Sequence, residues 1–485
     1  MRVSSLGAQD AVLSILRFVP EVPKPPRRLG LRERLFWTGV VLIVYMAMCQ
    51  IPLYGIQWSA QTYEPLLLFQ VIMASRRGTL MELGIGPLVT AGIVWQLVVG
   101  SRIIELDLTT REGRRIFAGV QKLLAFIFAA LEAIAYIWGG VYGPLPPASQ
   151  ALIFLQLMAA SFIVILMDDM LEKGWGVGSA VSLFIAAGVT QQVFWELFSP
   201  IGPMSDGLFV GVVPSIFHAL FTYTSTGNST LLMELVARRS GYPDLLGLAS
   251  MVGFLLLLTY LESMRIEIPV AAARYGGIRA RIPLKFLYVS NLPVILVSAL
   301  YANLFMVARA VWSRYNPDNS NPWLNVFAMF NATNGRLVPL KPSLIYYLTP
   351  PRTVWAAYQD PVHVVVYTAV FVALCIAFAL VWVAAAGMDP ASQAEQLVKA
   401  ELQVPGFRSS TRILEAMLRT YIWPLTVLSG AIVGLIAVVS DLLGTLGSGI
   451  GILLTVGILV QYQQLLAREQ LIEMHPVLSR LLSTK

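Results

Sequence analysis

Ten long apolar segments are the feature that most constrains what this chain can fold into. A helix of about 20 apolar residues crosses the hydrocarbon core of a bilayer. By this criterion the sequence predicts membrane spans at residues 36–55, 78–100, 116–139, 150–172, 177–198, 244–264, 286–312, 362–386, 420–442 and 445–467. Only 13% of the residues are charged, against about 25% in soluble domains. We therefore expect a multi-pass integral membrane protein.

The positions of the basic residues predict its orientation. If the N-terminus is cytoplasmic, the cytoplasmic regions hold 25 of the 34 Lys and Arg residues and the outer regions hold the other 9. Basic residues favour cytoplasmic loops, so we expect both termini in the cytoplasm. The outer segment 208–222 is too short to span and is expected to be interfacial or re-entrant. Asn228 and Asn331 lie in outer glycosylation sequons, and whether they are modified stays open.

Residues that could carry catalysis are scattered along the chain. His218, His363 and His475 share no metal-ligand spacing, and the sequence contains no HExxH, GxSxG or P-loop motif. We therefore expect no enzyme activity, no cofactor and no metal site. Cys49 and Cys375 lie in apolar runs and are expected to be buried thiols.

Two carboxylates, Glu82 and Glu132, fall at membrane depth. They could form the proton relay of a secondary transporter, or they could make polar contacts between spans. The residues alone leave both readings open. Asp168 and Asp169 stand at a cytoplasmic helix end, where we expect them to be solvated.

The segment from Arg76 to Asp107 is apolar enough to cross a bilayer but is interrupted by a glutamate, a proline and several glycines. Such a segment is tolerated where it is buried in protein or lines a water-filled cavity. Within it, Ile85 and Val89 share one helix face, as Val181 and Ile185 do in a later span. These aliphatic faces either pack spans together or form a hydrophobic constriction.

Two cytoplasmic loops carry many basic residues. Residues 265–285 contain two short extended runs, RIEIPV and RARIPLK, around a turn at Tyr275-Gly276-Gly277. This loop is either a solvated basic loop or a docking site for an anionic partner such as ribosomal RNA. Residues 387–419 add further basic residues, including Arg408 and Arg412.

Several long motifs follow one another along nearly the whole chain. They are FVPEVPKP, CQIPLYGI, RGTLMELGIGPLVTAGIVWQL, FAGVQKLL, GVGSAVSLFIAAGV, RIEIPVAAARYGGIRARIPLKFLYVSNLPVIL, LTPPR with DPVH, and GTLGSGIGILL. Together they resemble the SecY family, the pore subunits of the Sec protein translocon, and they look closer to its archaeal members than to its eukaryotic ones.

The resemblance implies an all-α polytopic membrane fold. Ten transmembrane helices would form two pseudo-symmetric inverted five-helix halves, residues 1–205 and 206–485, around an hourglass pore. A plug helix at about residues 57–75 would close the outer funnel. The docking loops would be residues 265–285 and 387–419. A lateral gate would lie between the second and third spans on one side and the seventh and eighth on the other.

The resemblance also assigns roles to residues. The pore ring would be Ile85, Val89, Val181, Ile185, Ile295 and Leu454. The plug would include Tyr63, Leu66, Leu67, Phe69, Val71 and Ile72. Glu132 and Asn303 would be polar residues of the lateral gate. Ribosome docking would use Arg274, Arg279, Arg281 and Arg408, although Gly276 and Pro405 replace arginines that many relatives carry.

The implied function is that of the central pore-forming subunit of a protein-conducting channel. It would translocate unfolded secretory polypeptides and release transmembrane segments laterally into lipid. The implied partners are the small SecE/gamma and beta subunits, the ribosome, the nascent polypeptide, signal sequences and membrane lipid. An archaeal member would lie in the plasma membrane and a eukaryotic one in the endoplasmic reticulum. The alternative is a proton-coupled secondary transporter that uses Glu82 and Glu132.

Overall fold

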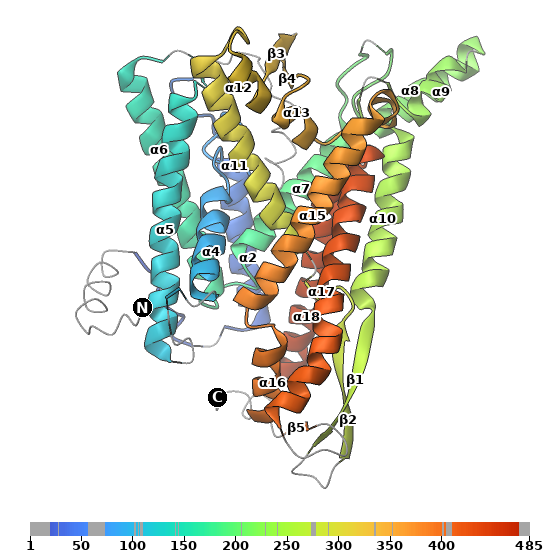
Figure 1. The fold of residues 1–485 in the computed structure, drawn as a ribbon. Helices are drawn as coiled ribbons and strands as arrows, with labels where there is room; N and C mark the ends of the chain where they lie inside the picture. The colour runs from blue at the N-terminus through green and yellow to red at the C-terminus, as the bar shows by residue number, and fades with distance from the viewer. Residues whose placement is uncertain are drawn as a thin grey trace.

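The computed structural model describes residues 20–27, 29–56, 73–100, 103–104, 106, 110–140, 142–143, 145–204, 206–227, 229–239, 241–272, 278–289, 291–333, 336–351, 353–399, 402–403 and 410–474. Each predicted span contains a helix (Figure 1). These helices are α2 (Leu31–Met48), α4 (Gly86–Gly100), α5 (Arg111–Trp138), α6 (Pro147–Glu172), α7 (Ala180–Phe198), α10 (Leu245–Ser263), α11 (Leu292–Tyr315), α15 (Pro361–Ala385), α17 (Thr411–Leu442) and α18 (Gly449–Met474).

Shorter elements lie in the connections. The helices are α8 (Val212–Thr226), α9 (Thr230–Val236), α12 (Pro322–Phe327), α13 (Leu344–Leu348), α14 (Val354–Gln359) and α16 (Pro390–Lys399). The strands are β1 (Arg265–Ala272), β2 (Ile278–Lys285), β3 (Phe330–Thr333), β4 (Arg336–Pro339) and β5 (Leu402–Gln403). We call the end of the bundle that carries β1 and β2 the hairpin end, and the opposite end the α8 end (Figure 1).

Eight of the helices in the described part of the chain are long and apolar enough to cross a membrane. The two span helices outside these eight are α2 and α4. The first, α2, begins with a charged turn, and α4 has only 15 residues. The predicted helix from residue 78 onward is wrong for residues 78–85, which form turns. Gly78 and Gly84 have φ angles of +71° and +56°, which glycine adopts without a steric penalty. The helix begins only at Gly86-Pro87, where the missing N–H of proline costs nothing.

Polar side chains define where several spans begin. Oγ1 of Thr110 accepts a hydrogen bond from N of Gly113 at 3.0 Å, at the start of α5. Oδ1 of Asp244 accepts one from N of Gly247 at 2.7 Å, at the start of α10. Such caps satisfy backbone donors that have no partner within the helix, and each stabilises it by about 1 kcal/mol.

Two seams join the first five spans to the last five. At the front seam, α4 and α5 pack against α11 and α15 (Figure 1). At the back seam, α7 packs against α18. At the hairpin end, Nη1 of Arg34 in α2 lies 2.9 Å from Oε1 of Glu469 in α18. The start of the first span and the end of the last span therefore lie at the same end of the bundle, as an even number of spans requires.

Two local predictions are confirmed. The extended runs of residues 265–285 form the antiparallel pair β1–β2, with Arg265 opposite Lys285 and Ala272 opposite Ile278. The predicted turn at residues 275–277 lies outside the described residues. Strand β5 extends this sheet along β1. Cys49 and Cys375 are both buried free thiols.

Candidate pore and lateral gate

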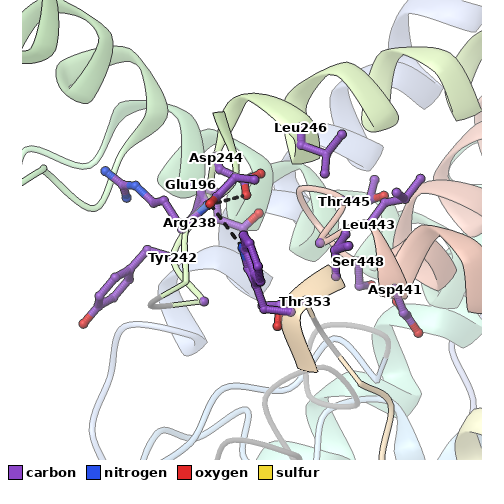
Figure 2. A pocket seen from close by; sticks show the side chains of 16 residues that line it. Glu196, Arg238, Tyr242, Asp244, Leu246, Thr353, Asp441, Leu443, Thr445 and Ser448 are labelled. Carbon is purple, nitrogen blue, oxygen red and sulfur yellow. Dashed lines mark hydrogen bonds between the residues drawn. The ribbon is translucent and has the colours of Figure 1, made fainter. Parts of the chain in front are cut away.

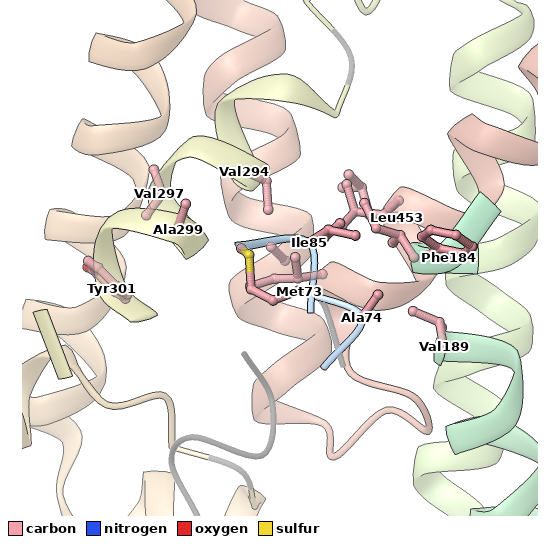
Figure 3. Packing of buried hydrophobic residues seen from close by; sticks show 14 of the residues in the cluster. Met73, Ala74, Ile85, Phe184, Val189, Val294, Val297, Ala299, Tyr301 and Leu453 are labelled. Carbon is pink, nitrogen blue, oxygen red and sulfur yellow. The ribbon is translucent and has the colours of Figure 1, made fainter. Parts of the chain in front are cut away.

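The six aliphatic residues predicted to form a ring all belong to one large apolar cluster, together with many other core residues. Ile85, Ile185 and Leu454 are buried members of the cluster, and the other three pack against it half-buried. They come from the turn before α4 and from α4, α7, α11 and α18. In the view of Figure 3, Ile85 lies between Val294 and Leu453, which belong to the same cluster. These elements belong to both groups of five spans, so the cluster lies between the groups.

The backbone around Ile85 is held by a close crossing of two chain segments. N of Ile85 donates a hydrogen bond to O of Met73 at 2.8 Å. A Cβ atom on Gly84 would lie only 2.2 Å from that same oxygen. Only glycine fits at position 84, and the crossing fixes the direction in which Ile85 points (Figure 3).

Asp168 caps the helix that carries Val181 and Ile185. Oδ1 of Asp168 accepts hydrogen bonds from N of Ala180 at 3.1 Å and from N of Val181 at 3.4 Å. Asp168 is buried, so the prediction of a solvated side chain is wrong. The reason is that α7 begins against the end of α6, which brings its unpaired backbone donors to the carboxylate.

Asp169 is also buried, and the same prediction is wrong for it. Its Oδ1 lies 2.5 Å from Nζ of Lys122 in α5, and its Oδ2 lies 3.0 Å from Nζ of Lys173. Oδ2 also accepts a hydrogen bond from N of Val22 at 2.7 Å. A buried carboxylate needs such partners to offset its lost hydration. Here they tie the segment before the first span to the hairpin end of α6.

Small residues let the helices of the front seam approach closely near both ends of the seam. A Cβ atom on Gly100 would lie 2.3 Å from Cα of Ala385, and one on Gly139 would lie 2.9 Å from Cβ of Ala310. Small residues of this kind let helices approach closely without a large apolar side chain between them. The seam is therefore closed by backbone contact near both ends of the bundle.

A cavity of about 40 Å³ interrupts the middle of the front seam. It has room for water. Its polar lining consists of Ser75, Glu82, Thr90, Glu132, Tyr136 and Asn303. The two predicted gate residues, Glu132 in α5 and Asn303 in α11, thus face one cavity from opposite sides of the seam.

Glu82 is the other carboxylate at this cavity, and it is only 1% exposed. Its Oε2 accepts a hydrogen bond from N of Gly78, which stabilises the turn before α4. Its Oε1 has no hydrogen-bond partner among the described residues. A structural role of Glu82 in the turn therefore accounts for one of its two oxygens.

The back seam carries polar contacts between the two groups of spans. Oε2 of Glu196 in α7 accepts a hydrogen bond from N of Gly447, before α18, at 2.7 Å. Near the hairpin end, the hydroxyl of Tyr462 in α18 donates to O of Ser179 at 3.2 Å. At the α8 end, Glu196 lines a cavity of about 110 Å³ together with Asp244, Asp441, Thr445 and Ser448. Figure 2 shows these side chains. Sequence reasoning missed these residues, because no local pattern shows that α7 meets α18.

Two of the four predicted docking residues, Arg279 and Arg281, are among the described residues, and both lie in β2 at the hairpin end. Arg281 is exposed, and its Nη1 lies 2.5 Å from Oε2 of Glu267 in β1. This contact holds the pKa of Arg281 above its usual value. Arg279 lies opposite Ala271 in the β1–β2 ladder. Arg274 and Arg408 lie outside the described residues, as do all six predicted plug residues, Tyr63, Leu66, Leu67, Phe69, Val71 and Ile72.

Comparisons with known proteins match this architecture over nearly its whole length. The family model SecY matches residues 79–463, and the model described as the plug domain of Sec61p matches residues 43–78. The protein translocase subunit SecY of Aeropyrum pernix is 42% identical over 98% of this chain and 99% of its own. The Sec61 subunit alpha of Neurospora crassa is 35% identical over 96% of this chain and 98% of its own.

Solved structures give the same result. The structure described as a protein conducting channel has a TM-score of 0.76 and 36% identity, and the match covers 96% of this chain and 98% of that one. Sec61 from the canine ribosome-channel complex has a TM-score of 0.73 at 36% identity, with the same coverage of both chains. The chain therefore belongs to the SecY family.

Proposed function

We propose that this chain is the pore-forming subunit of a protein-conducting channel. It lets unfolded polypeptides cross the membrane and releases apolar segments sideways into lipid. The observation that carries the proposal is that the six ring residues, which come from both groups of spans, all belong to one large apolar cluster in the core. The ring is Ile85, Val89, Val181, Ile185, Ile295 and Leu454.

Aliphatic side chains suit a seal that must also let a chain pass. A narrow ring of them excludes water, and without water ions do not cross. The side chains can change rotamer around a passing polypeptide without breaking hydrogen bonds. The proposed channel is passive, with no covalent step, and a translating ribosome supplies the force. The plug at about residues 57–75 adds a second barrier on the outer side.

We further propose that residues 1–205 and 206–485 act as two halves that separate along the front seam. The front seam, with Glu132 and Asn303, is then the lateral gate. The polar cavity supports this role, because a seam with room for water has fewer packing contacts to break than one that is packed throughout. The close contacts at Gly100 and Gly139 keep the resting gate shut.

The hairpin end is proposed to face the cytoplasm, with both termini there. Arg274, Arg279, Arg281 and Arg408 then offer positive charge to ribosomal RNA, whose phosphates bind Lys and Arg without sequence readout. The ribosome is part of the complex named for the canine relative. The small SecE/gamma and beta subunits complete the proposed complex, and its membrane is the plasma membrane of an archaeon.

A stalled secretory nascent chain tests the proposal directly. A photo-crosslinking residue replaces Ile85 or Ile185 in the ring, or Ile163, which lies exposed on α6, as the matched control. We expect crosslinks from positions 85 and 185 and none from 163. Absence of both ring crosslinks in membranes that still secrete would overturn the pore assignment.

The transporter alternative makes the opposite prediction. A proton relay through Glu82 and Glu132 would lose solute uptake in Glu82→Gln or Glu132→Gln, with secretion intact. A channel should keep secreting in both variants, and neither the variants nor the unchanged protein should show proton-coupled solute uptake.

A further inference from the structure

The helix α8 begins at the membrane boundary. The connection from α7 folds back on itself, since N of Val210 donates to O of Ile201 at 2.8 Å and N of Gly211 donates to O of Ser199 at 3.1 Å. A Cβ atom on Gly211 would lie 2.6 Å from N of Ser199. The first residue of α8 therefore lies beside the last turn of α7, where this span leaves the hydrocarbon core.

The chain returns to the same boundary after α9. N of Arg238 donates to Oδ2 of Asp244 at 3.1 Å, and Asp244 caps the first turn of α10. Leu235 at the end of α9 packs in one apolar cluster with Leu245, the first residue of α10. The α8–α9 segment thus leaves and rejoins the bundle at the level where α7 ends and α10 begins, and it projects outward there (Figure 1).

A buried arginine fixes how α8 is rotated. Nη2 of Arg238 donates to O of Phe209 at 2.8 Å and to Oγ of Ser215 at 2.9 Å. Ser215 and Ala219 are buried on the inner face of α8. The opposite face is therefore held outward rather than free to turn.

That outward face is apolar and bare. Phe217 is 68% exposed, Leu220 46% and Phe221 73%, and their spacing places them on one side of the helix. The sequence of α8, VVPSIFHALFTYTST, contains no Asp, Glu, Lys or Arg. Aromatic and aliphatic residues on one face of such a helix are typical of a segment that lies in the membrane interface.

The bare face continues the lipid-facing surface of the bundle. At the end of α7, Phe194, Trp195 and Phe198 are exposed, as aromatic residues often are where spans meet the headgroups. We propose that α8 lies in the outer lipid–water interface, with Phe217, Leu220 and Phe221 inserted among the lipids of the outer leaflet. It neither spans the membrane nor re-enters it, and it anchors the connection between the fifth and sixth spans.

Site-directed spin labelling tests this placement. The two native cysteines are buried, so a single introduced cysteine takes the nitroxide. The labels are placed at Phe221→Cys and Leu220→Cys on α8, in the full complex in phospholipid vesicles. Leu256→Cys, exposed in the middle of α10, is the lipid control, and Asp318→Cys, exposed between α11 and α12, is the water control.

Dissolved oxygen concentrates in lipid, whereas a nickel chelate stays in water. The experiment compares how strongly each reagent enhances the relaxation of the nitroxide label. We expect both α8 labels to be severalfold more accessible to oxygen than to the chelate, as at Leu256. The proposal is overturned if they behave as at Asp318, which would place α8 in water. It is equally overturned if both reagents are excluded, which would mean that a protein covers this face. The Leu256 label reports separately on whether the chain spans the bilayer.

Discussion

Among single residues, Gly84 combines a backbone conformation that favours glycine with no room for a side chain. Its φ is +56°, and any Cβ atom would meet O of Met73 at 2.2 Å. We expect Gly84→Ala to lower the free energy of unfolding by about 1–3 kcal/mol, the cost of a residue forced into such a conformation. In α2, Gly39 has no atom within 4 Å of a built Cβ, so Gly39→Ala should be neutral or stabilising by up to about 1 kcal/mol.

The midpoint of thermal unfolding in detergent compares the two variants. Equal midpoints would contradict the close crossing of residues 73 and 84. The same crossing positions Ile85, so Gly84→Ala should also loosen the ring and raise ion leakage.

The ring itself makes a second prediction at this scale. Ile85 is fully buried in the aliphatic cluster. In Ile85→Ser the constriction becomes wider and more polar, so water should fill it more often and ions should pass. Conductance across a planar bilayer should rise at least severalfold over that of the unchanged channel. Ile163→Ser on the exposed side of α6 should leave conductance unchanged, and a leak of equal size there would argue against the ring.

Among elements, α4 and α15 of the front seam approach closely near the hairpin end because position 100 is a glycine. A Cβ atom on Gly100 of α4 would lie 2.3 Å from Cα of Ala385 in α15. We therefore expect Gly100→Val to wedge the seam open near the hairpin end, so that segments of marginal hydrophobicity leave into lipid more often. The measurement is the fraction of a marginal segment that becomes membrane-embedded.

The matched control for the wedge is Gly253→Val in α10, where a Cβ atom would meet nothing within 4 Å. It should leave the embedded fraction as in the unchanged channel. If both substitutions shift this fraction alike, the front seam is not the exit route.

The stability of α13 and of its contacts with Lys341 and Asp360, which we call the α13 strap, should depend on pH. Oδ2 of Asp360 lies 2.5 Å from Nζ of Lys341 and accepts a hydrogen bond from the hydroxyl of Tyr346 at 2.8 Å. The contact with Lys341, and then that with Tyr346, holds the pKa of Asp360 below its usual value of about 3.9. A lowered pKa means that the carboxylate stabilises the strap fully above the unfolded value and loses this effect as the pH falls through the folded value.

Hydrogen exchange of residues 344–348 checks this dependence. Relative to intrinsic exchange rates, protection should be constant from pH 5 to 8 and should fall below about pH 4. Asp360→Asn should exchange faster from pH 5 to 8 and lose the dependence, and the unchanged protein should approach its rate at low pH. Asp318→Asn, elsewhere in the same connection between α11 and α15, should change neither. A pH dependence that survives in Asp360→Asn would assign it to a different group.

The sequence predicted the elements better than their contacts. Apolar length predicts a segment that contains a helix in each of the ten cases, because crossing a bilayer leaves few alternatives. Eight of the helices in the described part of the chain are long and apolar enough to cross. Apolar length places the start of the second span too early, because hydropathy carries no information about the positive φ angles of Gly78 and Gly84. It also misjudges Asp168, which looks solvated at a helix end until α7 folds back onto it. The ring and gate residues were matched by family motif, whereas Glu196 and Tyr462 of the back seam carry no local signal.

For the whole molecule, the two seams differ in what joins them. At the back, Glu196 and Tyr462 make hydrogen bonds across the seam near both of its ends. At the front, the described contacts near both ends are close approaches of small residues. If the halves open like a clam shell, the back seam is the axis and should keep its distances while the front seam widens.

Disulfides across each seam test this geometry. A Cβ atom on Gly447 would lie 3.8 Å from Cβ of Val193 at the back, and one on Gly139 would lie 2.9 Å from Cβ of Ala310 at the front. The back pair has the Cβ–Cβ spacing of about 3.8 Å that is usual for a disulfide. The front pair is closer than the usual range of about 3.5–4.5 Å, so its two Cβ atoms must move slightly apart for the bond to form. We expect the oxidised Gly139→Cys/Ala310→Cys channel to lose most translocation and to recover it on reduction. The oxidised Val193→Cys/Gly447→Cys channel should keep most of its activity, because an axis need not open. Equal loss in both would mean that the halves separate along both seams.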